Sequence, residues 1–528
     1  MKSKNVGILI LFLSCVFMAQ GQQRDKKMVH IERADQMIGV RTSDKDYQRL
    51  IGDVLIRHDS TYFYCDSAHY YETERSFDAF SRVHIIVNDS VEIFSDLLYY
   101  DGQQRFAEFF DNVRLVDDST TLETDYLTYD RTSHLASYPQ YGVTIRGDKK
   151  LVSRVGHYRD DIKEFSFFTE VEVTNPEYQM YTDTLYYNTN IERMWFYGPT
   201  TIVNEDNVLE GERGYYLVDD RVSYIDKNPV LHNTTQRAVS DSIYYDAYRG
   251  FAKMMNDVDM IDSSYSVILK GQYVELWENL GKSFATGQAQ SIYYDDEDSL
   301  FLHSDTLFFY FKTDYNEEEK LMAYYNVRFY RSDMQGLSDS LVYFTADSTL
   351  RMRGNPVLWA DNSQLTADSI NIIMENRRID SIYQYSRAFI ISQDSIEGFN
   401  QIKGNDIVSR FKSGRLNKVN VVSNAESIYW LREDDASLIG INVSKSADMT
   451  IIIDRNTISR IKYYKAIDET LFPELDLKES SRYLDGFIWE SEIRPQDKND
   501  IFRVVERKAP EKASDSKNEQ KKGRRQKQ

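Results

Sequence analysis

The chain has 528 residues, a net charge of −20 and 41% hydrophobic residues. This length exceeds the roughly 250–300 residues at which one compact core stops growing, which excludes a single globular core. The acidic balance argues against a nucleic-acid-binding protein. Only Cys65 follows the N-terminal segment, which excludes an intramolecular disulfide and a thiolate metal cluster.

Residues 1–21 are predicted to be a secretory signal peptide. Lys2 and Lys4 give a basic start, residues 6–18 are mainly apolar, and Ala19-Gln20-Gly21 fits a small-residue cleavage site. Cys15 raises the alternative of a lipoprotein. Apolar residues continue beyond Cys15, which favours ordinary cleavage. No later stretch approaches the ~20 apolar residues that a membrane-spanning helix needs.

A five-residue phrase then recurs: Asp, a small or apolar residue, Leu or Ile, any residue, and an aromatic residue. Its clear copies begin at Asp96, Asp125, Asp183, Asp241, Asp305 and Asp339, with weaker copies at Asp66 and Asp368. The step from Asp96 to Asp125 is 29 residues, and the steps from Asp125 to Asp183 and from Asp183 to Asp241 are each 58. A fixed period of this size predicts one structural unit stacked many times.

A second, alternating phrase lies between these copies, as in Val113-Arg114-Leu115 and Val327-Arg328-Phe329. Each unit is therefore predicted to contain two strands joined by polar turns. About a dozen units fit between residues 40 and 430. Two stretches, near residues 270–305 and 305–339, are longer than the period, and we expect longer loops there.

The repeated Asp is interpreted as a structural residue, because a catalytic group needs one special environment. A hydrogen bond to the backbone of a turn would account for it. A calcium ladder is the alternative, but the Gly-rich Asp loops typical of such ladders are absent from the sequence.

We find no pattern typical of an active site or a cofactor site. The eight histidines are scattered, and no metal-binding spacing, nucleophile elbow, P-loop or dinucleotide fingerprint occurs. Acidic residues are numerous enough to supply a glycosidase pair by chance. The sequence therefore predicts a protein that is not an enzyme and needs no cofactor or metal.

The alternating strands predict an apolar interior between two sheets. This interior is either a closed, dry core or a slightly open groove that shields acyl chains from water. The predicted inner, ligand-contacting positions are Val83, Ile85, Leu98, Val113, Leu115, Leu127, Val143, Ile145, Val171, Val173 and Leu185. The alternation alone does not separate the two possibilities.

The order and period of these motifs resemble the OstA-like family, to which periplasmic lipopolysaccharide-transport proteins belong. The resemblance covers roughly residues 28–500 and rests on the recurring Asp phrase together with Gly52-Asp53-Val54, Asp111-Asn112-Val113-Arg114-Leu115 and Leu484-Asp485-Gly486-Phe487-Ile488-Trp489. It divides the chain into an OstA-like β-repeat solenoid at 28–432, a C-terminal β cap at 433–500 and a basic disordered tail at 501–528. The tail from Lys508 carries +5 and the signal peptide +2, so the body between them carries −27.

The resemblance implies an all-β fold: an elongated β-jelly-roll or folded-sheet solenoid of about a dozen repeats of 29–34 residues. It implies a periplasmic location, with association to the outer membrane as an option. The implied partners are lipopolysaccharide or another acylated glycolipid, and lipopolysaccharide-transport proteins that add a strand to an exposed edge. A structural envelope scaffold without bound lipid and a secreted carbohydrate-active β-helix enzyme remain as alternatives.

Overall fold

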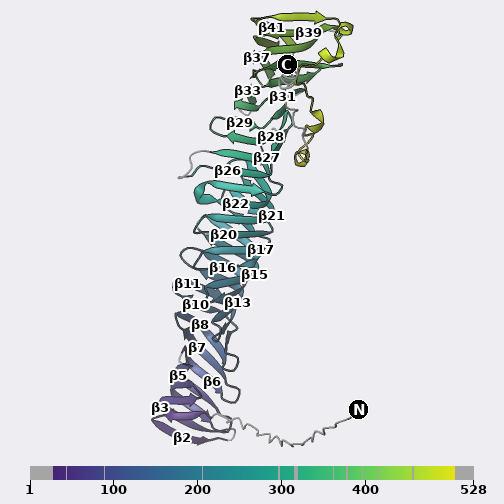
Figure 1. The fold of residues 1–528 in the computed structure, drawn as a ribbon. Coiled ribbons are helices and arrows are strands. Elements are labelled where there is room, and N and C mark those ends of the chain that lie inside the picture. Colours follow the sequence, from purple (N-terminus) through teal and green to yellow (C-terminus); the bar gives the residue numbers. More distant parts are fainter. Residues whose placement is uncertain are drawn as a thin grey trace, which may run out of the picture. The chain divides into compact units, whose positions relative to one another are not determined.

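The structure is a computed structural model that describes residues 28–505 except 43–44, 89, 205, 295–297, 314–318, 361, 376–377, 395, 414, 434 and 455–456. The predicted signal peptide, Cys15 and most of the predicted basic tail lie outside the described residues. Over these residues the chain forms 42 strands and five single-turn 3-10 helices, so the all-β prediction is confirmed (Figure 1). No helix in this part of the chain is long and apolar enough to cross a membrane.

The chain divides into two units, and the boundary at Thr169 falls within one strand. Unit 1 contains β1 (His30–Arg33), β2 (Gln36–Arg41), β3 (Asp46–His58), β4 (Thr61–Tyr71), β5 (Ser76–Val87), β6 (Val91–Asp101), β7 (Phe106–Asp117), β8 (Thr120–Asp130), β9 (Leu135–Tyr138), β10 (Gly142–Arg146), β11 (Lys149–Ser153), β12 (Val155–Arg159) and the start of β13 (Glu164–Thr174).

Unit 2 begins at Glu170. Its strands are β14 (Gln179–Asn188), β15 (Arg193–Asn204), β16 (Asn207–Leu217), β17 (Val222–Lys227), β18 (Val230–His232), β19 (Gln236–Val239), β20 (Ser242–Asp246), β21 (Phe251–Asp262), β22 (Val267–Trp277), β23 (Lys282–Thr286), β24 (Gln290–Tyr293), β25 (Leu300–His303), β26 (Thr306–Tyr310), β27 (Lys320–Arg331), β28 (Met334–Phe344), β29 (Thr349–Arg353), β30 (Val357–Ala360), β31 (Ser363–Thr366), β32 (Ser369–Glu375), β33 (Arg378–Tyr385), β34 (Ala388–Gln393), β35 (Phe399–Gly404), β36 (Asp406–Lys412), β37 (Arg415–Val422), β38 (Ala425–Arg432), β39 (Leu438–Ser446), β40 (Asp448–Asp454), β41 (Thr457–Tyr464) and β42 (Asp468–Phe472). The 3-10 turns are η1 (Glu278–Leu280), η2 (Glu474–Asp476), η3 (Glu479–Ser481), η4 (Ser491–Ile493) and η5 (Asp500–Phe502).

Every second long strand of unit 1 bends near its middle, where two residues in succession adopt the left-handed backbone conformation; β4, β6 and β8 pair with these strands and contain no such residues. In β5 these are Ser81 and Arg82, with φ of 62° and 46°, and in β7 they are Asp111 and Asn112, with φ of 61° and 53°. The pairing register shifts at the same places. Such a double bulge turns the strand sharply. We name the two resulting halves half-sheet A, which includes residues 97–101 and 106–110 of unit 1 and 184–188 and 242–246 of unit 2, and half-sheet B, which includes residues 91–95 and 113–117 of unit 1 and 363–366 and 399–404 of unit 2.

The two half-sheets face each other across one interior. In unit 1, the ring of Phe63 on half-sheet B lies 5.0 Å from the ring of Phe77 and 4.7 Å from the ring of Tyr100, both on half-sheet A. All three side chains are almost completely buried. The long strands β4 to β8 begin every 14 or 15 residues, so two bent strands make one repeat of the predicted length.

The recurring Asp lies at the bend, on the outside of the strand pair. The Asp96 carboxylate accepts a hydrogen bond of 2.7 Å from the side chain of Asn112, and Asp305 accepts one of 2.8 Å from Asn326. Asn112 and Asn326 are themselves left-handed bend residues. The weaker copies Asp66 and Asp368 accept bonds of 2.6 Å and 2.7 Å from Arg82 and Arg387, which are also left-handed bend residues. These contacts support the structural role, although the partner is more often a bend side chain than turn backbone.

The region predicted as a C-terminal β cap contains β39–β42, but the strands end at Phe472. Residues 473–505, which we call the strap, form 3-10 turns and extended backbone against the outer face of half-sheet B in unit 2 (Figure 1, yellow). Gln401 donates to the Arg482 carbonyl at 2.8 Å and accepts from the Leu484 nitrogen at 2.8 Å. Gln364 makes the same pair of bonds with Ile488 and Glu490. The expectation of β structure throughout 433–500 is therefore wrong for the strap, whose backbone is satisfied by side chains.

The strap also covers an apolar surface. Outer residues of β34, β38 and β39 form one buried cluster with strap residues Leu477 and Leu484, joined by Phe487 and Trp489. A second cluster, Leu337, Val357 and Trp359, packs against Ile493. Half-sheet B is therefore apolar on both faces where the strap lies.

The bend contacts predict a measurable stability term. Asp305→Ala removes the bond to Asn326 and should lower the free energy of unfolding by about 1 kcal/mol, the usual net value of such a hydrogen bond. Asp148→Ala, at an exposed turn position, is the matched control and should have a smaller effect. Urea unfolding of both variants checks this; equal effects would contradict the role of the bend.

The strap contacts give a second prediction. The double substitution Gln364→Ala and Gln401→Ala leaves four backbone groups of the strap without their partners, at a cost of about 1–3 kcal/mol per site. We expect limited proteolysis to cut residues 473–505 sooner, while far-UV circular dichroism still reports the strands. Gln393→Ala, at an exposed position of β34, is the control and should leave the cleavage rate unchanged.

Candidate functional site

Nine of the eleven predicted inner residues point into the interior and are at most 2% exposed: Val83, Ile85, Leu98, Val113, Leu115, Leu127, Val171, Val173 and Leu185. Those in unit 1 share the interior with buried aromatic rings such as Phe63 and Phe109. The side chains of unit 1 therefore form a packed core, which corresponds to the closed, dry core of the two predicted interiors.

Polar contacts join the two half-sheets of unit 1 at the edge opposite the bends. Arg105 from half-sheet A lies 2.8 Å from the carboxylate of Asp59, which is in the β3–β4 turn of half-sheet B. The Tyr100 hydroxyl is 2.7 Å from His58 Nδ1 and accepts a bond of 2.7 Å from Arg131. These contacts close the interior of unit 1 at this position.

The prediction is wrong for Val143 and Ile145. Both lie in β10 and point outward, and Ile145 is 39% exposed. Gly142 and Thr144 take the inner positions instead, because they pair with the inner residues Thr124 and Leu122 of β8.

The large ring of Tyr138 explains why small residues face inward here. A Cβ atom on Gly142 would lie 2.5 Å from the Tyr138 ring, and one on Gly156 would lie 2.3 Å from it. The Tyr138 hydroxyl is 2.7 Å from Ser153 Oγ. One aromatic side chain with its own polar partner therefore fills the space that apolar residues of β10 were expected to fill.

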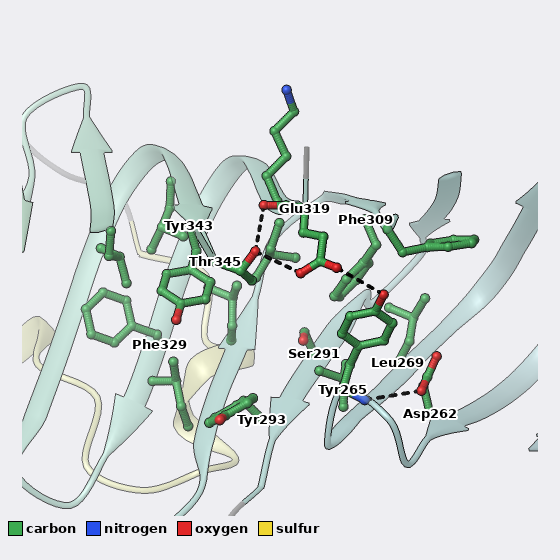
Figure 2. Close-up of a pocket in the computed structure, with 18 of the residues that line it drawn as sticks. Asp262, Tyr265, Leu269, Ser291, Tyr293, Phe309, Glu319, Phe329, Tyr343 and Thr345 are labelled. Atoms are coloured by element: carbon green, nitrogen blue, oxygen red, sulfur yellow. Dashed lines mark hydrogen bonds between the residues drawn. The ribbon is translucent and has the colours of Figure 1, made fainter. Parts of the chain in front are cut away.

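Unit 2 contains an open apolar cavity of about 220 Å³ between its half-sheets. This volume far exceeds the roughly 10–15 Å³ that a single water needs. Its lining comes from inner positions of β21–β32 and is mostly aliphatic and aromatic, with Met260, Val267, Leu269, Leu300, Leu302, Phe309, Leu321, Phe329, Met334, Leu341, Tyr343 and Leu350 among the residues. Figure 2 shows Leu269, Phe309, Phe329 and Tyr343 around this space.

Two small inner residues help to open the interior at this place. Ser283 of β23 pairs with Leu276 and Phe309, and Ser291 of β24 pairs with Leu269 and Leu302. Both serines are buried and line the cavity. The stretch also contains the two longer units that the sequence indicated, so the irregular spacing was the signal that could have located the cavity.

A polar rim crosses the mouth of the cavity. The Tyr265 hydroxyl, from the turn after β21, donates to Glu319 Oε1 at 3.3 Å (Figure 2). Thr345 Oγ1 donates to the Glu319 carbonyl at 3.0 Å and contacts its carboxylate at 3.2 Å. Burial, together with the Glu319 charge, raises the pKa of Tyr265, so this phenol stays a neutral donor at physiological pH.

A second cavity in unit 2, of about 340 Å³, is polar. Tyr245 accepts a bond of 2.9 Å from Asn207 and donates to Glu278 at 3.4 Å. Burial raises the pKa of Glu278. This cavity therefore suits hydroxyl-rich or solvated groups rather than an acyl chain.

The described residues offer no group of three or more His, Cys, Asp or Glu side chains arranged to hold a metal ion. Cys65 is buried, and burial raises the pKa of its thiol to about 12. A thiol with this pKa is unreactive as a nucleophile. The apolar cavity is therefore the site that the geometry supports best.

Comparison with known proteins gives a family match over part of the chain. Residues 26–183 match the family model of OstA-like protein, which confirms the resemblance indicated by the sequence motifs. No curated protein matches the chain. Among solved structures, it is similar to LptH from Pseudomonas aeruginosa, described as the LptA homologous periplasmic component of the conserved lipopolysaccharide transport device, with 13% identity and a TM-score of 0.22 over 26% of this chain and 95% of that chain.

The two interiors should respond differently to an added ring. Ser291→Phe places the ring in existing space, so the free energy of unfolding should change by less than about 1 kcal/mol. Val113→Phe, in the packed core of unit 1, should lower it by about 1–3 kcal/mol through overpacking. Thermal and urea unfolding check this, and an equal loss for both variants would contradict an open cavity.

Proposed function

Because residues 26–183 are OstA-like, we propose that this protein is a periplasmic lipopolysaccharide-binding or bridging protein of lipopolysaccharide transport and outer-membrane assembly. The observation that carries the proposal is the apolar cavity between the half-sheets of unit 2. An acyl chain of the lipid would enter this cavity, with its polar part outside the rim.

The energetics favour such a ligand. Each methylene moved from water into an apolar site gains about 0.8 kcal/mol. The lining residues Leu269, Leu302 and Phe309 offer apolar contact from both half-sheets. The rim residues Tyr265 and Glu319 would face the polar part of the lipid. The polar groups of the lipid would then stay at the rim and would not be buried without hydrogen-bond partners.

Exposed strand edges suit the bridging role. Among the described residues, β1 and β2 both pair with β3, and β41 pairs with β40. Unpaired backbone groups on such strands can accept a strand of another protein. We propose that lipopolysaccharide-transport proteins bind at these edges.

A structural scaffold that holds no lipid is the second candidate. The packed interior of unit 1, with its edge contacts between Asp59 and Arg105, favours this reading for that unit. For the secreted carbohydrate-active enzyme, the polar cavity around Glu278 is the place to look for a pair of carboxylates, although no such pair was predicted from the sequence.

Site-specific photo-crosslinking in cells tests the proposal. A photoreactive phenylalanine analogue in place of Tyr293, a cavity-lining residue, should transfer its label to lipopolysaccharide. The same analogue at Ile145 points outward from unit 1 and should not. Ser291→Phe, combined with the analogue at Tyr293, should reduce the labelling because its ring occupies the cavity.

The result that would overturn lipid binding is equally specific. Absence of lipopolysaccharide adducts at both Tyr293 and Leu302, with the protein folded and exported, would leave the scaffold function in place.

A further inference from the structure

The outer face of half-sheet A in unit 2 carries five aromatic residues in one cross-strand row. Each pairs directly with the next across neighbouring strands β14, β15, β16, β17 and β20. We call this set the outer aromatic row; it consists of Tyr186, Trp195, Tyr215, Tyr224 and Tyr244.

The row faces away from the interior. The residues that flank Tyr186 and Trp195 in their strands, namely Leu185, Tyr187, Met194 and Phe196, are completely buried. Because successive side chains of a strand point to opposite faces, the row residues point outward. Each of the five remains partly accessible to solvent. The strap lies on half-sheet B and therefore does not cover them.

The fold itself does not require aromatic residues at this register. The fourth position of the Asp phrase is Tyr186 and Tyr244 in unit 2, whereas it is Tyr99 and Thr128 in unit 1. The corresponding cross-strand row of unit 1 contains one phenol among mainly polar side chains: His69, Asp78, Tyr99, Glu108, Thr128, Ser137, His157 and Ser166. Unit 1 forms the same backbone with mainly polar residues at this register. The aromatic residues of the row in unit 2 are therefore not needed for folding, which indicates another role for them.

Cations accompany the rings. The Arg193 guanidinium lies 5.0 Å from the centre of the Trp195 ring and 3.9 Å from that of Tyr215. Lys253 continues the row on the next strand, paired with Tyr244. Glu275 pairs with Lys253 on the following strand. Asp246 lies on the same face as Tyr244 and two residues beyond it, so the positive charge of the row is concentrated at Arg193. An acidic group of a ligand is therefore favoured at Arg193.

The spacing points to a ligand with repeating units. Adjacent strands lie about 4.7–4.9 Å apart, and the rings of Tyr215 and Tyr224 are centred 5.4 Å from each other. A row with this spacing matches an extended polymer whose monomers repeat at a similar interval. Tyr and Trp combine an apolar ring with a hydrogen-bonding group, as the C–H faces and hydroxyls of a sugar require.

We propose that the outer aromatic row binds an extended, β-linked polysaccharide, whose sugar rings pack along the row and whose acidic substituents meet Arg193. A lipid membrane fits less well, because four of the five side chains end in a hydroxyl, which is unfavourable to bury in an apolar lipid layer. This surface is on the opposite face from the cavity interior, so the proposal is independent of lipid binding.

The test is isothermal titration of the full mature chain with cellohexaose as a neutral probe and hyaluronan as an acidic one. Both should bind, and hyaluronan more tightly. A row variant combines Trp195→Ser, Tyr215→Thr and Tyr224→Thr, the residue types that unit 1 uses at this register. It should lose at least about tenfold in affinity for each probe. Tyr99→Thr in unit 1 is the matched control and should bind like the parent.

Several outcomes overturn the proposal. These are a parent chain that binds neither probe, a row variant with unchanged affinity, and a row variant that loses binding only to phosphatidylglycerol vesicles. Circular dichroism and thermal unfolding establish that the row variant is folded. If it is not, the single change Arg193→Gln serves instead: it should reduce the preference for hyaluronan over cellohexaose, and an unchanged preference contradicts the role of Arg193.

Discussion

The double left-handed bend in alternate long strands is the constraint on which the rest of the structure depends. A non-glycine residue in this conformation costs roughly 1–2 kcal/mol, and bends such as Asp111-Asn112 use two of them. The recurring Asp on the neighbouring strand offsets part of this cost, as Asp96 does through its bond to Asn112. Without the bend the strands would form one sheet with an apolar face in water. With it, each strand contributes to both half-sheets and the interior is shared.

Once the bends fix the distance between the half-sheets, side-chain size decides whether the interior is filled. In unit 1, rings such as Phe63 and Phe77 meet across the interior and leave a packed core. In unit 2, Ser283 and Ser291 occupy equivalent inward positions and help to leave a cavity. The same repeat can thus enclose either a packed core or an open cavity, with no change in its strand pairing. Closed core and open groove were posed as alternatives for the whole chain, but they apply to different parts of it.

Periodicity gave the all-β class, the repeat length and the position of the recurring Asp, because these depend on local pattern. It failed where the outcome depends on distant partners. Val143, Thr144 and Ile145 alternate as a strand should. Tyr138 decides which of them face inward, because its ring leaves room only for Gly142 at the neighbouring inner position. The strap could not be predicted from its own residues, since Gln364 and Gln401 satisfy its backbone from more than 80 positions away. A signal did exist in Val357-Leu358-Trp359, an apolar run without alternation that marks a strand buried on both faces.

The two faces of each half-sheet are free to differ because successive side chains point in opposite directions. The inner face must stay apolar for the chain to fold, whereas the outer face is limited mainly by solubility and by pairing across strands. In unit 2 the outer face of half-sheet B is apolar and is covered by the strap, through residues such as Leu484. The outer face of half-sheet A is aromatic around Trp195 and Tyr215, where Arg193 rather than the strap contacts the rings. The strap covers an apolar surface on strands between β28 and β39, whereas the aromatic row lies on strands between β14 and β20, so packing and the proposed recognition use different strands as well as different faces.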